Sequence, residues 1–302
     1  MRVVLVTGGQ GRLASSIEGP LSRAGWAVVA KSRSELDITD ASAVRSCVQT
    51  LRPDAILNLA AWTHADACEA DPERAFLVNA EGVAHLRVAA AAAGAHLCHL
   101  SSDYVFDGRA HRPYREDDPA APVSVYGRSK LAGEAEAGPS ATVVRVAWIS
   151  GRHGRSLVRS ALDAGRDPSR RLRFVTDQQG SPTVGDDLAP ALAHLLEHRI
   201  PGIFHAANAG SATPHDLACH VLLAAGLDPD RVEAITTAEL RPARPAARPP
   251  YAVLDTARLA TAGVAPLPPW RESVARLVHQ MLADHPLTPV SRARSVLASR
   301  AS

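Results

Sequence analysis

Lysine and aromatic residues are scarce in this chain of 302 residues. Of its 33 basic residues only Lys31 and Lys130 are lysines, and Phe, Trp and Tyr together make up 4% of the chain. Such a low aromatic content disfavours a surface on which nucleic-acid bases stack. The formal net charge is only +2, and no basic run is interleaved with aromatics. We therefore expect no nucleic-acid partner.

Cysteines and long apolar runs are also sparse. The chain has four scattered cysteines and no CxxC pair, which indicates free thiols in a reducing compartment. No apolar run reaches membrane-spanning length, and the N-terminal RVVLVTG reads as a strand rather than as a signal sequence. These features predict a soluble cytoplasmic protein with no membrane partner.

Strand-like and helix-like patterns alternate through the first half of the chain. Predicted strands cover 2–8, 27–32, 55–61, 96–102 and 141–148, and predicted helices cover 12–24, 40–51, 72–93 and a segment from about 124. The strands are almost continuously apolar, as in a parallel sheet that is covered on both faces. The pattern predicts an α/β fold with a Rossmann-type doubly wound parallel sheet.

The second half has a different texture, which predicts a smaller substrate lobe. Helical patterns occupy 155–165, 186–198, 214–225 and 271–283, with short strands near 172–175 and 203–206. We expect a dinucleotide-binding domain over 1–150, to which segments from about 180–210 and 240–256 return. Residues 151–284 then form mainly the substrate-binding lobe, and 285–302 form a flexible tail.

A glycine-rich turn follows the first strand directly, in the sequence TGGQGRLA. Gly8, Gly9 and Gly11 with Ala14 fit two spacings of the dinucleotide fingerprint. Glycines let the chain turn sharply into a helix and approach a pyrophosphate closely, and the N-terminus of that helix attracts the negative charge. Its place between a strand and a helix favours dinucleotide binding over an ordinary tight turn.

The end of the second strand bears on the choice of dinucleotide. In NAD-binding proteins an acidic side chain there bonds the 2′-hydroxyl of the ribose. Here the sequence has Lys31 and Arg33, and Arg12 lies within the glycine turn. These cations favour NADP(H), although they could also be solvated loop charges, and Glu35 or Asp37 could favour NAD(H) instead.

Tyr126 and Lys130 are spaced i,i+4 in the segment VSVYGRSKLAGE, so on a helix they share one face. An ammonium beside a phenol is expected to lower the pKa of the phenol, which can then exchange a proton with a carbonyl oxygen. Ser102 ends the fourth predicted strand and could polarise the same oxygen. The alternative, a surface Tyr and Lys on one helix, is less consistent with this combination.

Several longer motifs resemble those of a known protein family. The segments ELDITD (35–40), LSSDYVFDG (100–108), VSVYGRSKLAGE (123–134) and VTDQQGSPT (175–183), among others, resemble dTDP-4-dehydrorhamnose reductases, which are extended members of the short-chain dehydrogenase/reductase superfamily. The resemblance covers the chain to about residue 284. It implies an NADPH- or NADH-dependent reductase of a nucleotide-linked 4-keto-6-deoxy sugar, with dTDP-L-rhamnose or a close relative as the product.

The resemblance also implies roles for individual residues. Tyr126 would be the general acid, Lys130 its electrostatic partner and the anchor of the ribose, and Ser102 the hydroxyl that orients the carbonyl. Positions matched to the cofactor are Gly8, Gly11, Arg12, Leu13, Asp37, Ile38, Ala60, Ala61, Trp62 and Thr63. Positions matched to the substrate are Ser102, Asp103, Tyr104, Tyr126, Trp148 and Arg248.

Two other functions of this fold stay open at the sequence level. One is a sugar-nucleotide epimerase that retains its NAD, and the other is a non-catalytic regulatory subunit, which the presence of Tyr126 and Lys130 argues against. Ser16 stands where some bacterial members have a magnesium-binding glutamate at a dimer contact. We therefore predict no metal, and either a monomer or a homodimer.

Several further polar residues are expected to have no role in catalysis. His96 and His99 would point to opposite faces of the fourth strand, so one metal could not bind both from that strand. Arg241 and Arg244 lie in the segment RPARPAARPP and read as solvated loop residues. The acidic residues of REDDPAAP (115–122) likewise read as loop solvation.

Overall fold

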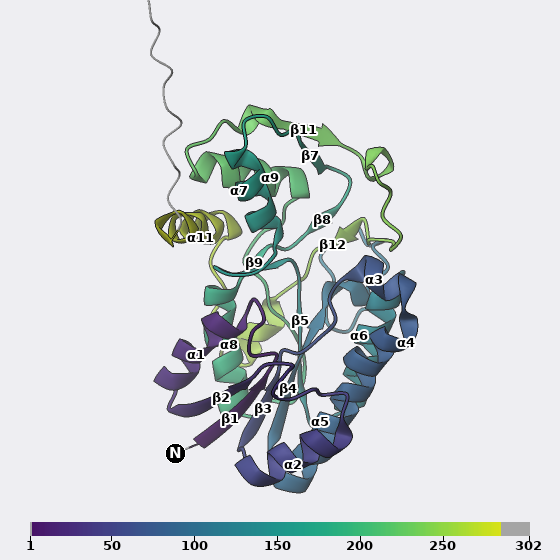
Figure 1. Ribbon diagram of the computed structural model, residues 1–302, viewed down its shortest axis with the longest axis vertical. Helices are drawn as coiled ribbons and strands as arrows, with labels where there is room; N and C mark the ends of the chain where they lie inside the picture. The colour runs from purple at the N-terminus through teal and green to yellow at the C-terminus, as the bar shows by residue number, and fades with distance from the viewer. Residues whose placement is uncertain (1, 285–302) are drawn as a thin grey trace, which may run out of the picture.

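A parallel sheet of six strands forms the centre of the larger part of the molecule (Figure 1). The computed structural model describes residues 2–284, so the predicted tail lies outside the described residues. The strand order is β10-β5-β4-β3-β1-β2, and every pair is parallel. The strands are β1 (Arg2–Thr7), β2 (Trp26–Lys31), β3 (Ala55–Asn58), β4 (His96–Ser102), β5 (Thr142–Val146) and β10 (Gly202–His205). The predicted α/β fold with a doubly wound sheet is confirmed.

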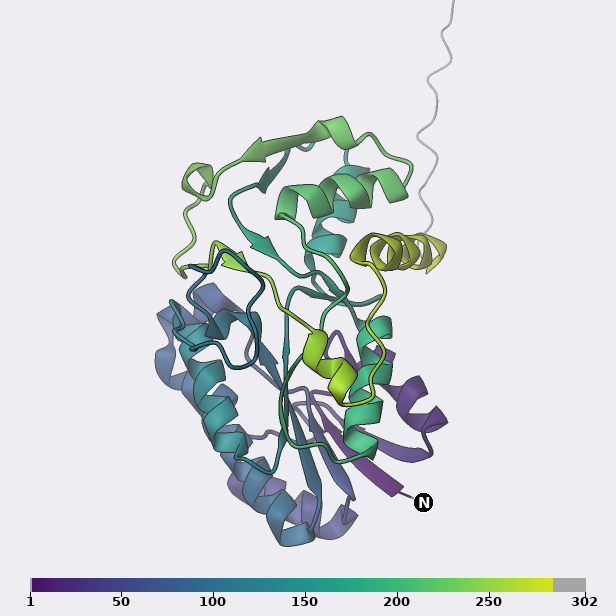
Figure 2. The same ribbon diagram turned by 180° about the vertical axis from the view of Figure 1, so that it is seen from behind.

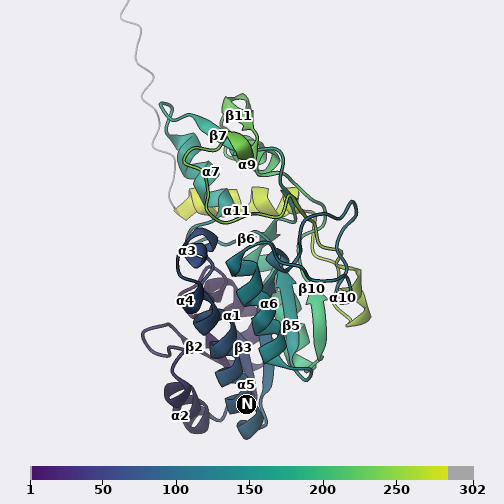
Figure 3. The same ribbon diagram turned by 90° about the vertical axis from the view of Figure 1, so that its right-hand side faces the viewer.

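Helices cover both faces of this sheet. On one face lie α1 (Ala14–Arg23) and α8 (Gly185–Glu197), and on the other lie α2 (Ala41–Leu51), α5 (Gly82–Ala93) and α6 (Val125–Ala137). Figure 3 shows α5 and α6 side by side along the second face. In such sheets ligands bind beyond the carboxyl ends of the strands where the order reverses, which here is between β1 and β3.

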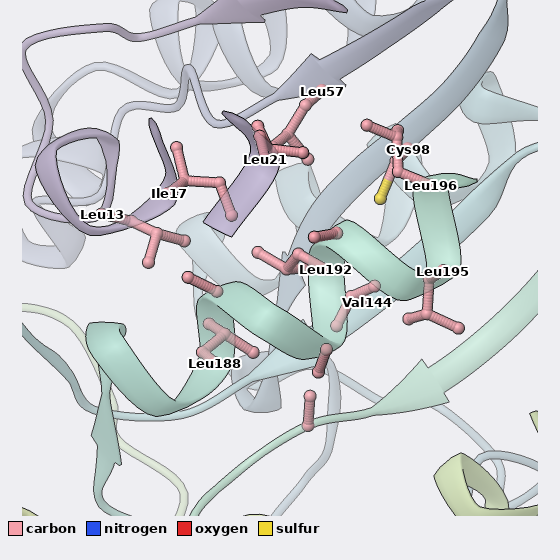
Figure 4. Close-up of a cluster of buried hydrophobic side chains, with 14 of the residues drawn as sticks. Leu13, Ile17, Leu21, Leu57, Cys98, Val144, Leu188, Leu192, Leu195 and Leu196 are labelled. Carbon is pink, nitrogen blue, oxygen red and sulfur yellow. The ribbon is translucent and has the colours of Figure 1, made fainter. Parts of the chain in front are cut away.

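The core on the α1 and α8 face shows why these segments form helices. Leucines spaced three or four residues apart on α8 form a continuous apolar stripe, as a buried helix face requires. Figure 4 shows this stripe meeting Ile17 and Leu21 of α1 and the strand residues Leu57 and Val144. The leucines of the stripe are Leu188, Leu192, Leu195 and Leu196, each completely buried.

The helix predicted over 72–93 is interrupted. The structure has α4 (Pro72–Phe76), then a π-helical turn over Leu77–Glu81, then α5, with a separate short helix α3 (Ala65–Ala70) before them that the sequence did not predict. The π-turn directs the buried side chain of Asn79 toward the backbone of Trp62, where Oδ1 accepts from Trp62 N at 2.8 Å. Insertions of this kind often occur beside functional sites.

A smaller lobe lies beyond the carboxyl edge of the sheet (Figure 2). Its helices are α7 (Leu157–Arg166), α9 (Pro214–Ala224) and α11 (Trp270–Asp284), and Figure 2 shows α11 lying beside α9. Three two-stranded sheets pair β7 (Leu172–Val175) with β11 (Val232–Ile235), β8 (Gln179–Gly180) with β12 (Tyr251–Ala252), and β6 (Ile149–Ser150) with β9 (Thr183–Val184). A separate apolar core around Trp270 holds the lobe helices together. The short helix α10 (Ala257–Thr261) packs near β10.

Among residues 2–284, no helix combines the length and the apolar composition that crossing a bilayer would require.

Candidate active site

A cleft of about 580 Å³ lies between the carboxyl edge of the sheet and the smaller lobe. The sheet domain contributes the glycine turn, the ends of β3 and β4, and the start of α6, while the lobe contributes residues near β7 and the loop that precedes β12. Predicted site residues that line it are Gly11, Arg12, Leu13, Ala61, Thr63, Ser102, Asp103, Tyr104, Tyr126, Lys130, Trp148 and Arg248.

The glycine turn is crowded by backbone from two neighbouring strands. Gly8 has φ +69°, and a Cβ there would lie 2.8 Å from the backbone N of Ala60. A Cβ on Gly9 would lie 3.0 Å from the backbone N of Lys31. No side chain caps the N-terminus of α1, where the N–H groups of Ala14 and Ser16 donate to the backbone oxygens of Gly11 and Leu13. The positive end of the helix dipole still favours an anion there. This cradle fits the diphosphate of a dinucleotide.

The residues that follow β2 form a separate charged cluster. Lys31 Nζ lies 3.9 Å from Glu35, and Arg33 Nε lies 3.4 Å from Asp37. None of these four side chains lines the cleft itself, and neither does Ile38, whose side chain is buried against Gly82 at the start of α5. Because two acids accompany the two cations, this cluster alone does not distinguish a cofactor with a 2′-phosphate on its ribose from one with a 2′-hydroxyl.

In the segment that directly follows β3, alternate residues line the cleft. Ala61 and Thr63 line it, whereas Ala60 packs behind the glycine turn and Trp62 points away, with the guanidinium of Arg74 4.7 Å from the centre of its ring. Both hydrogen bonds between Asn79 and the backbone of Trp62 fix this segment. The unpredicted π-turn therefore positions a wall of the site.

Tyr126 and Ser102 lie together at the base of the cleft, as predicted. Tyr126 is 8% exposed and Ser102 is 6% exposed. The expectation that Lys130 lowers the pKa of Tyr126 is wrong for this structure. Burial raises the pKa of Tyr126, while a hydrogen bond with Ser102 and the charge of Arg12 oppose the rise only partly. The phenol is consequently protonated at neutral pH.

Lys130 is one turn further along α6 and is 1% exposed. Its Nζ donates to the carbonyl of Leu100 at 2.7 Å and lies 3.3 Å from Nε2 of His99. Burial lowers the pKa of Lys130 to about 8, although the nearby charge of Glu134 acts in the opposite direction. At neutral pH this amino group still carries its proton, but a small rise in pH removes it.

Asp103 and Tyr104 follow β4 and complete the base of the cleft. Burial raises the pKa of Asp103 to about 7, and one of its carboxylate oxygens is a buried atom without a hydrogen-bond partner among the described residues. The Tyr104 ring meets that of Tyr126 edge to face, with ring centres 5.3 Å apart. Gly127 lets α6 approach this segment, since a Cβ there would lie 2.1 Å from the carbonyl oxygen of Tyr104.

Trp148 lines the cleft and has a strained backbone, with φ +44°. Its indole lies against Gly180, where an added Cβ would be 2.7 Å from Cε2 of the ring. A non-glycine residue is rarely held in the left-handed region, and such strain often accompanies function. Because Gly180 has no side chain, the indole of Trp148 has room at this position in the cleft.

Arginines form the outer wall. Arg248 donates from Nη1 and Nη2 to the two carboxylate oxygens of Asp66, at 2.6 and 2.8 Å. The hydrogen bond from Arg248 is the largest cause that lowers the pKa of Asp66 to about 2, and burial of the acid acts in the opposite direction. Arg244, predicted to be a solvated loop residue, instead lines the cleft, and so does Arg173. Arg241 bonds only the backbone of its own loop among the contacts of the described residues.

Some of the cleft residues gave no signal in the sequence. Asp66 is one of several acids in a helical stretch, Arg173 and Ser160 belong to no motif, and Gln178 lies in the motif VTDQQGSPT (175–183) but was assigned no role, yet all four line the cleft. Their positions depend on how the lobe folds over the sheet.

Other polar candidates have structural partners. His96 Nε2 lies 2.7 Å from Thr142 Oγ1, and Ser16 donates to Asp186. The prediction that the acids of 115–122 only face solvent is wrong for Glu116, which is buried and accepts from the backbone N of His205 at 2.9 Å. Within residues 2–284, no three His, Cys, Asp or Glu side chains gather closely enough to hold a metal ion.

Comparison with known proteins gives consistent matches. A family model described as the RmlD substrate binding domain matches residues 1–283. A dTDP-4-dehydrorhamnose reductase of Streptomyces griseus is 45% identical over 279 residues, which cover 89% of this chain and 91% of that protein. A dTDP-4-keto-6-deoxy-D-glucose reductase of Streptomyces niveus is 37% identical over 284 residues, covering 93% and 98%.

A solved structure supports the same comparison. The crystal structure of dTDP-4-dehydrorhamnose reductase from Bacillus anthracis in complex with NADP superposes with a TM-score of 0.86. The two sequences are 30% identical, and the superposition covers 93% of this chain and 99% of the other.

Proposed function

Because the chain belongs to the dTDP-4-dehydrorhamnose reductase family, we propose that it is an NADPH-dependent reductase of a dTDP-linked 4-keto-6-deoxy sugar. The proposed reaction converts dTDP-4-dehydro-L-rhamnose, or a close deoxysugar relative, to the corresponding alcohol. The observation that carries the proposal is the meeting of Tyr126, Ser102 and Lys130 in one cleft with the glycine turn.

The cofactor site follows from the crowding at the glycine turn. Gly8 and Gly11 would let the backbone approach the diphosphate, Arg12 and Leu13 would lie beside it, and the segment Ala60–Thr63 would lie against the nicotinamide. Bound NADPH supplies the hydride for the carbonyl carbon. The relative from Bacillus anthracis is in complex with NADP, which supports the choice of NADPH.

The adenosine end of the cofactor has its own candidates. Lys31 and Arg33 would meet a 2′-phosphate, with Asp37 and Ile38 at the adenine edge. NADPH should therefore give a higher kcat/KM than NADH, and Arg33→Ser should reduce the ratio of the two constants. A ratio near one in the unaltered protein would count against Lys31 and Arg33 as phosphate ligands.

Tyr126 is placed to protonate the oxygen of the ketone. The raised pKa of Tyr126 keeps the phenol protonated, which is the form that a general acid needs in the reductive direction. An alkoxide is much more basic than a phenolate, so a proton moves readily from Tyr126 to the developing oxyanion. Ser102 Oγ donates to Asp103 Oδ1 at 2.9 Å in this structure, and by turning its hydroxyl it can donate to the same oxygen.

Lys130 provides the positive charge nearby. When Tyr126 gives up its proton, the phenolate that forms is buried and needs a compensating charge. The ammonium of Lys130 lies one helical turn away and can supply it. This role is stabilisation of the phenolate after transfer, rather than the lowering of the pKa of Tyr126 beforehand.

The lobe side of the cleft would hold the sugar nucleotide. Trp148 presents an indole to the cleft, on which the sugar ring can lie, with Asp103 and Tyr104 on the other side. Arg248, together with Arg244, offers donors to the diphosphate of the substrate. The lobe thus contributes recognition, and the sheet domain contributes the chemistry.

The proposed function is tested by following NADPH oxidation in the presence of dTDP-4-dehydro-L-rhamnose. We expect one NADPH consumed for each alcohol formed, with product configuration read by NMR. Retained NAD with no net NADPH consumption would instead select the epimerase. No turnover on any keto sugar, together with stable capture of another enzyme, would select the regulatory subunit.

The proposal also covers the domain organisation, the cellular compartment and the oligomeric state. We keep 1–150, with returning segments from about 180–210 and 240–256, as the dinucleotide-binding domain, and 151–284 as mainly the substrate lobe. We propose the cytoplasm as its compartment, on the strength of the free thiols. A monomer or a homodimer is expected, which sedimentation of the purified chain would distinguish.

A further inference from the structure

A buried polar chain runs from Lys130 into the sheet, away from the cleft. Nζ of Lys130 lies 3.3 Å from Nε2 of His99 on β4, and Nδ1 of the same ring lies 3.0 Å from Nδ2 of Asn58 on β3. Asn58 Oδ1 in turn accepts from Thr7 Oγ1 on β1 at 2.6 Å. His99, Asn58 and Thr7 are all completely buried.

The orientation of the Asn58 amide determines which nitrogen of His99 carries the proton. Oδ1 of Asn58 accepts from the backbone N of Ala60 at 3.2 Å and from Thr7, so Nδ2 must face His99. Nδ2 can only donate, which makes Nδ1 of His99 the acceptor. The imidazole is neutral, because burial and the charge of Lys130 hold the pKa of His99 well below its ordinary value. Its one proton is therefore on Nε2 and points at Lys130.

An N–H directed at Nζ suits a neutral amine and opposes an ammonium. The lone pair of an amine can accept from Nε2, while its own hydrogens donate to the carbonyl of Leu100. An ammonium has no lone pair, so it would meet the Nε2 proton of His99 without forming a bond. The chain ends at Thr7 beneath the glycine turn, and its members are shielded from solvent, so it has no route for passing protons out.

We propose that His99 is a positioning residue of this site, whose imidazole, with its tautomer set by Asn58, places the amino group of Lys130 and limits its positive charge. The inference rests on the proposed function for its catalytic meaning, because it concerns the group that compensates the Tyr126 phenolate. Its physical content, the charge of Lys130, can be measured without any substrate.

Other charged and titratable groups surround the same amino group. Glu134 lies one turn further on α6 and is itself paired with Arg145 of β5, Nη2 to Oε2 at 2.7 Å. Tyr126 precedes Lys130 on α6, Asp103 and Tyr104 follow β4, and Arg12 projects from the glycine turn. Among these, Glu134 favours the ammonium. His99 is the group in contact with Nζ that disfavours it.

The scarcity of lysine makes the charge of Lys130 directly observable. With lysine labelled by ¹³C at Cε, the full chain gives two signals, from Lys31 and Lys130, and Lys31→Arg assigns them. In the unaltered protein we expect Lys130 to titrate near pH 8. In His99→Gln the side-chain carbonyl can face the ammonium, and the midpoint should rise by roughly one pH unit.

His96→Gln is the matched control. His96 is a buried histidine on the same strand, bonded to Thr142 Oγ1, and does not contact Lys130. Its substitution should leave the Lys130 midpoint unchanged. Equal midpoints in folded His99→Gln, His96→Gln and the unaltered protein would overturn the proposal.

A measurement on the unaltered protein covers the case in which His99→Gln does not fold. Long-range ¹⁵N–¹H correlations of the imidazole should show His99 protonated at Nε2 and not at Nδ1. The opposite tautomer would overturn the proposal.

The pH dependence of activity relates the titration midpoint of Lys130 to the reaction. With kcat/KM for NADPH measured against pH, His99→Gln should shift the loss of activity on the alkaline side upward by the same roughly one unit. A shift in the NMR midpoint without turnover in any variant would contradict the proposed function and leave the role of His99 intact. Turnover with an unshifted alkaline limb would contradict the role of His99.

Discussion

The two walls of the cleft are built in opposite ways. On the sheet side the reactive groups are buried and fixed, with Lys130 1% exposed and Tyr126 8% exposed on a helix packed against the sheet. On the lobe side the arginines lie on loops and a short strand. Arg244 is exposed and the side chain of Arg173 is 37% exposed. Under the proposed function, the chemistry thus falls to the buried side of the cleft, and recognition of the substrate to the more exposed side.

Under the proposed function, this division would allow members of one family to act on different sugars by changes on the exposed side alone. The relatives from Streptomyces griseus and Streptomyces niveus are named for different dTDP-sugars. Substitutions on the exposed wall change contacts to a ligand at little cost in stability, whereas substitutions beneath Tyr126 disturb a packed core. The following predictions test whether the two walls differ in this way.

The largest effect is expected on the buried wall, from Tyr126→Phe. Removing the phenolic oxygen removes the proposed proton donor while keeping the ring against Tyr104. We expect kcat to fall by about 10³-fold, with NADPH affinity within about threefold of the original. Stopped-flow NADPH oxidation and fluorescence titration measure the two. An unchanged kcat would exclude Tyr126 as the acid.

Gly180→Ala tests the point where the lobe is as tightly packed as the sheet side. The added Cβ would lie 2.7 Å from the indole of Trp148, so the ring must move within the cleft. We expect kcat/KM for the sugar nucleotide to fall roughly 10- to 100-fold with NADPH binding retained.

Gly19→Ala on α1 is the control for Gly180→Ala, because its new Cβ would meet only the tip of Arg23 at 3.4 Å. It should leave kcat/KM unchanged. Equal values for both alanine variants would show that the position of Trp148 does not matter to the reaction.

Arg248→Ala tests the lobe side of the cleft at a side chain that is 12% exposed and paired with Asp66. Losing a charged donor to the diphosphate should raise KM for the sugar nucleotide about tenfold, with kcat changed less than about threefold. Arg112→Ala removes a two-bond pair of the same kind, with Asp118, on the surface. That control should leave both constants unchanged. A fall in kcat alone for Arg248→Ala would move this residue to the chemical step.

The smallest effect is on stability and depends on pH. The pKa of Asp103 in the folded protein, about 7, lies above its ordinary value of 3.8. Its ionisation therefore disfavours the folded state as pH rises through the interval from about 4 to 7, and costs nothing below pH 4. Asp103→Asn should raise Tm by a few degrees at pH 8 and hardly at all at pH 4. A gain in Tm that is the same at both pH values would contradict a buried, ionised Asp103.

The parts of the site that the sequence predicted are those set by short spacing. The glycine turn follows from its position between a strand and a helix, and Tyr126 and Lys130 share a face because they are four residues apart. Both depend on local geometry that any Rossmann-type βα unit reproduces.

The parts of the site that the sequence did not predict depend on contacts between residues far apart in the chain. Asp66 and Arg248 are 182 residues apart, and nothing local pairs them. The π-turn that places Asn79 depends on its contact with Trp62, against the helical propensity of the surrounding residues. The direction of the pKa shift of Tyr126 was also mispredicted, because spacing gives the distance to Lys130 but not the extent of burial.

The most direct test of the account follows the hydride and the proton together. The purified chain is given dTDP-4-dehydro-L-rhamnose and NADPH carrying deuterium at both positions of nicotinamide C4, and the product is examined by NMR. We expect deuterium at C4 of the sugar in an amount equal to the NADPH consumed, and no such transfer with Tyr126→Phe on the same timescale. A product without deuterium at C4, or equal transfer by Tyr126→Phe, would contradict the proposed reaction.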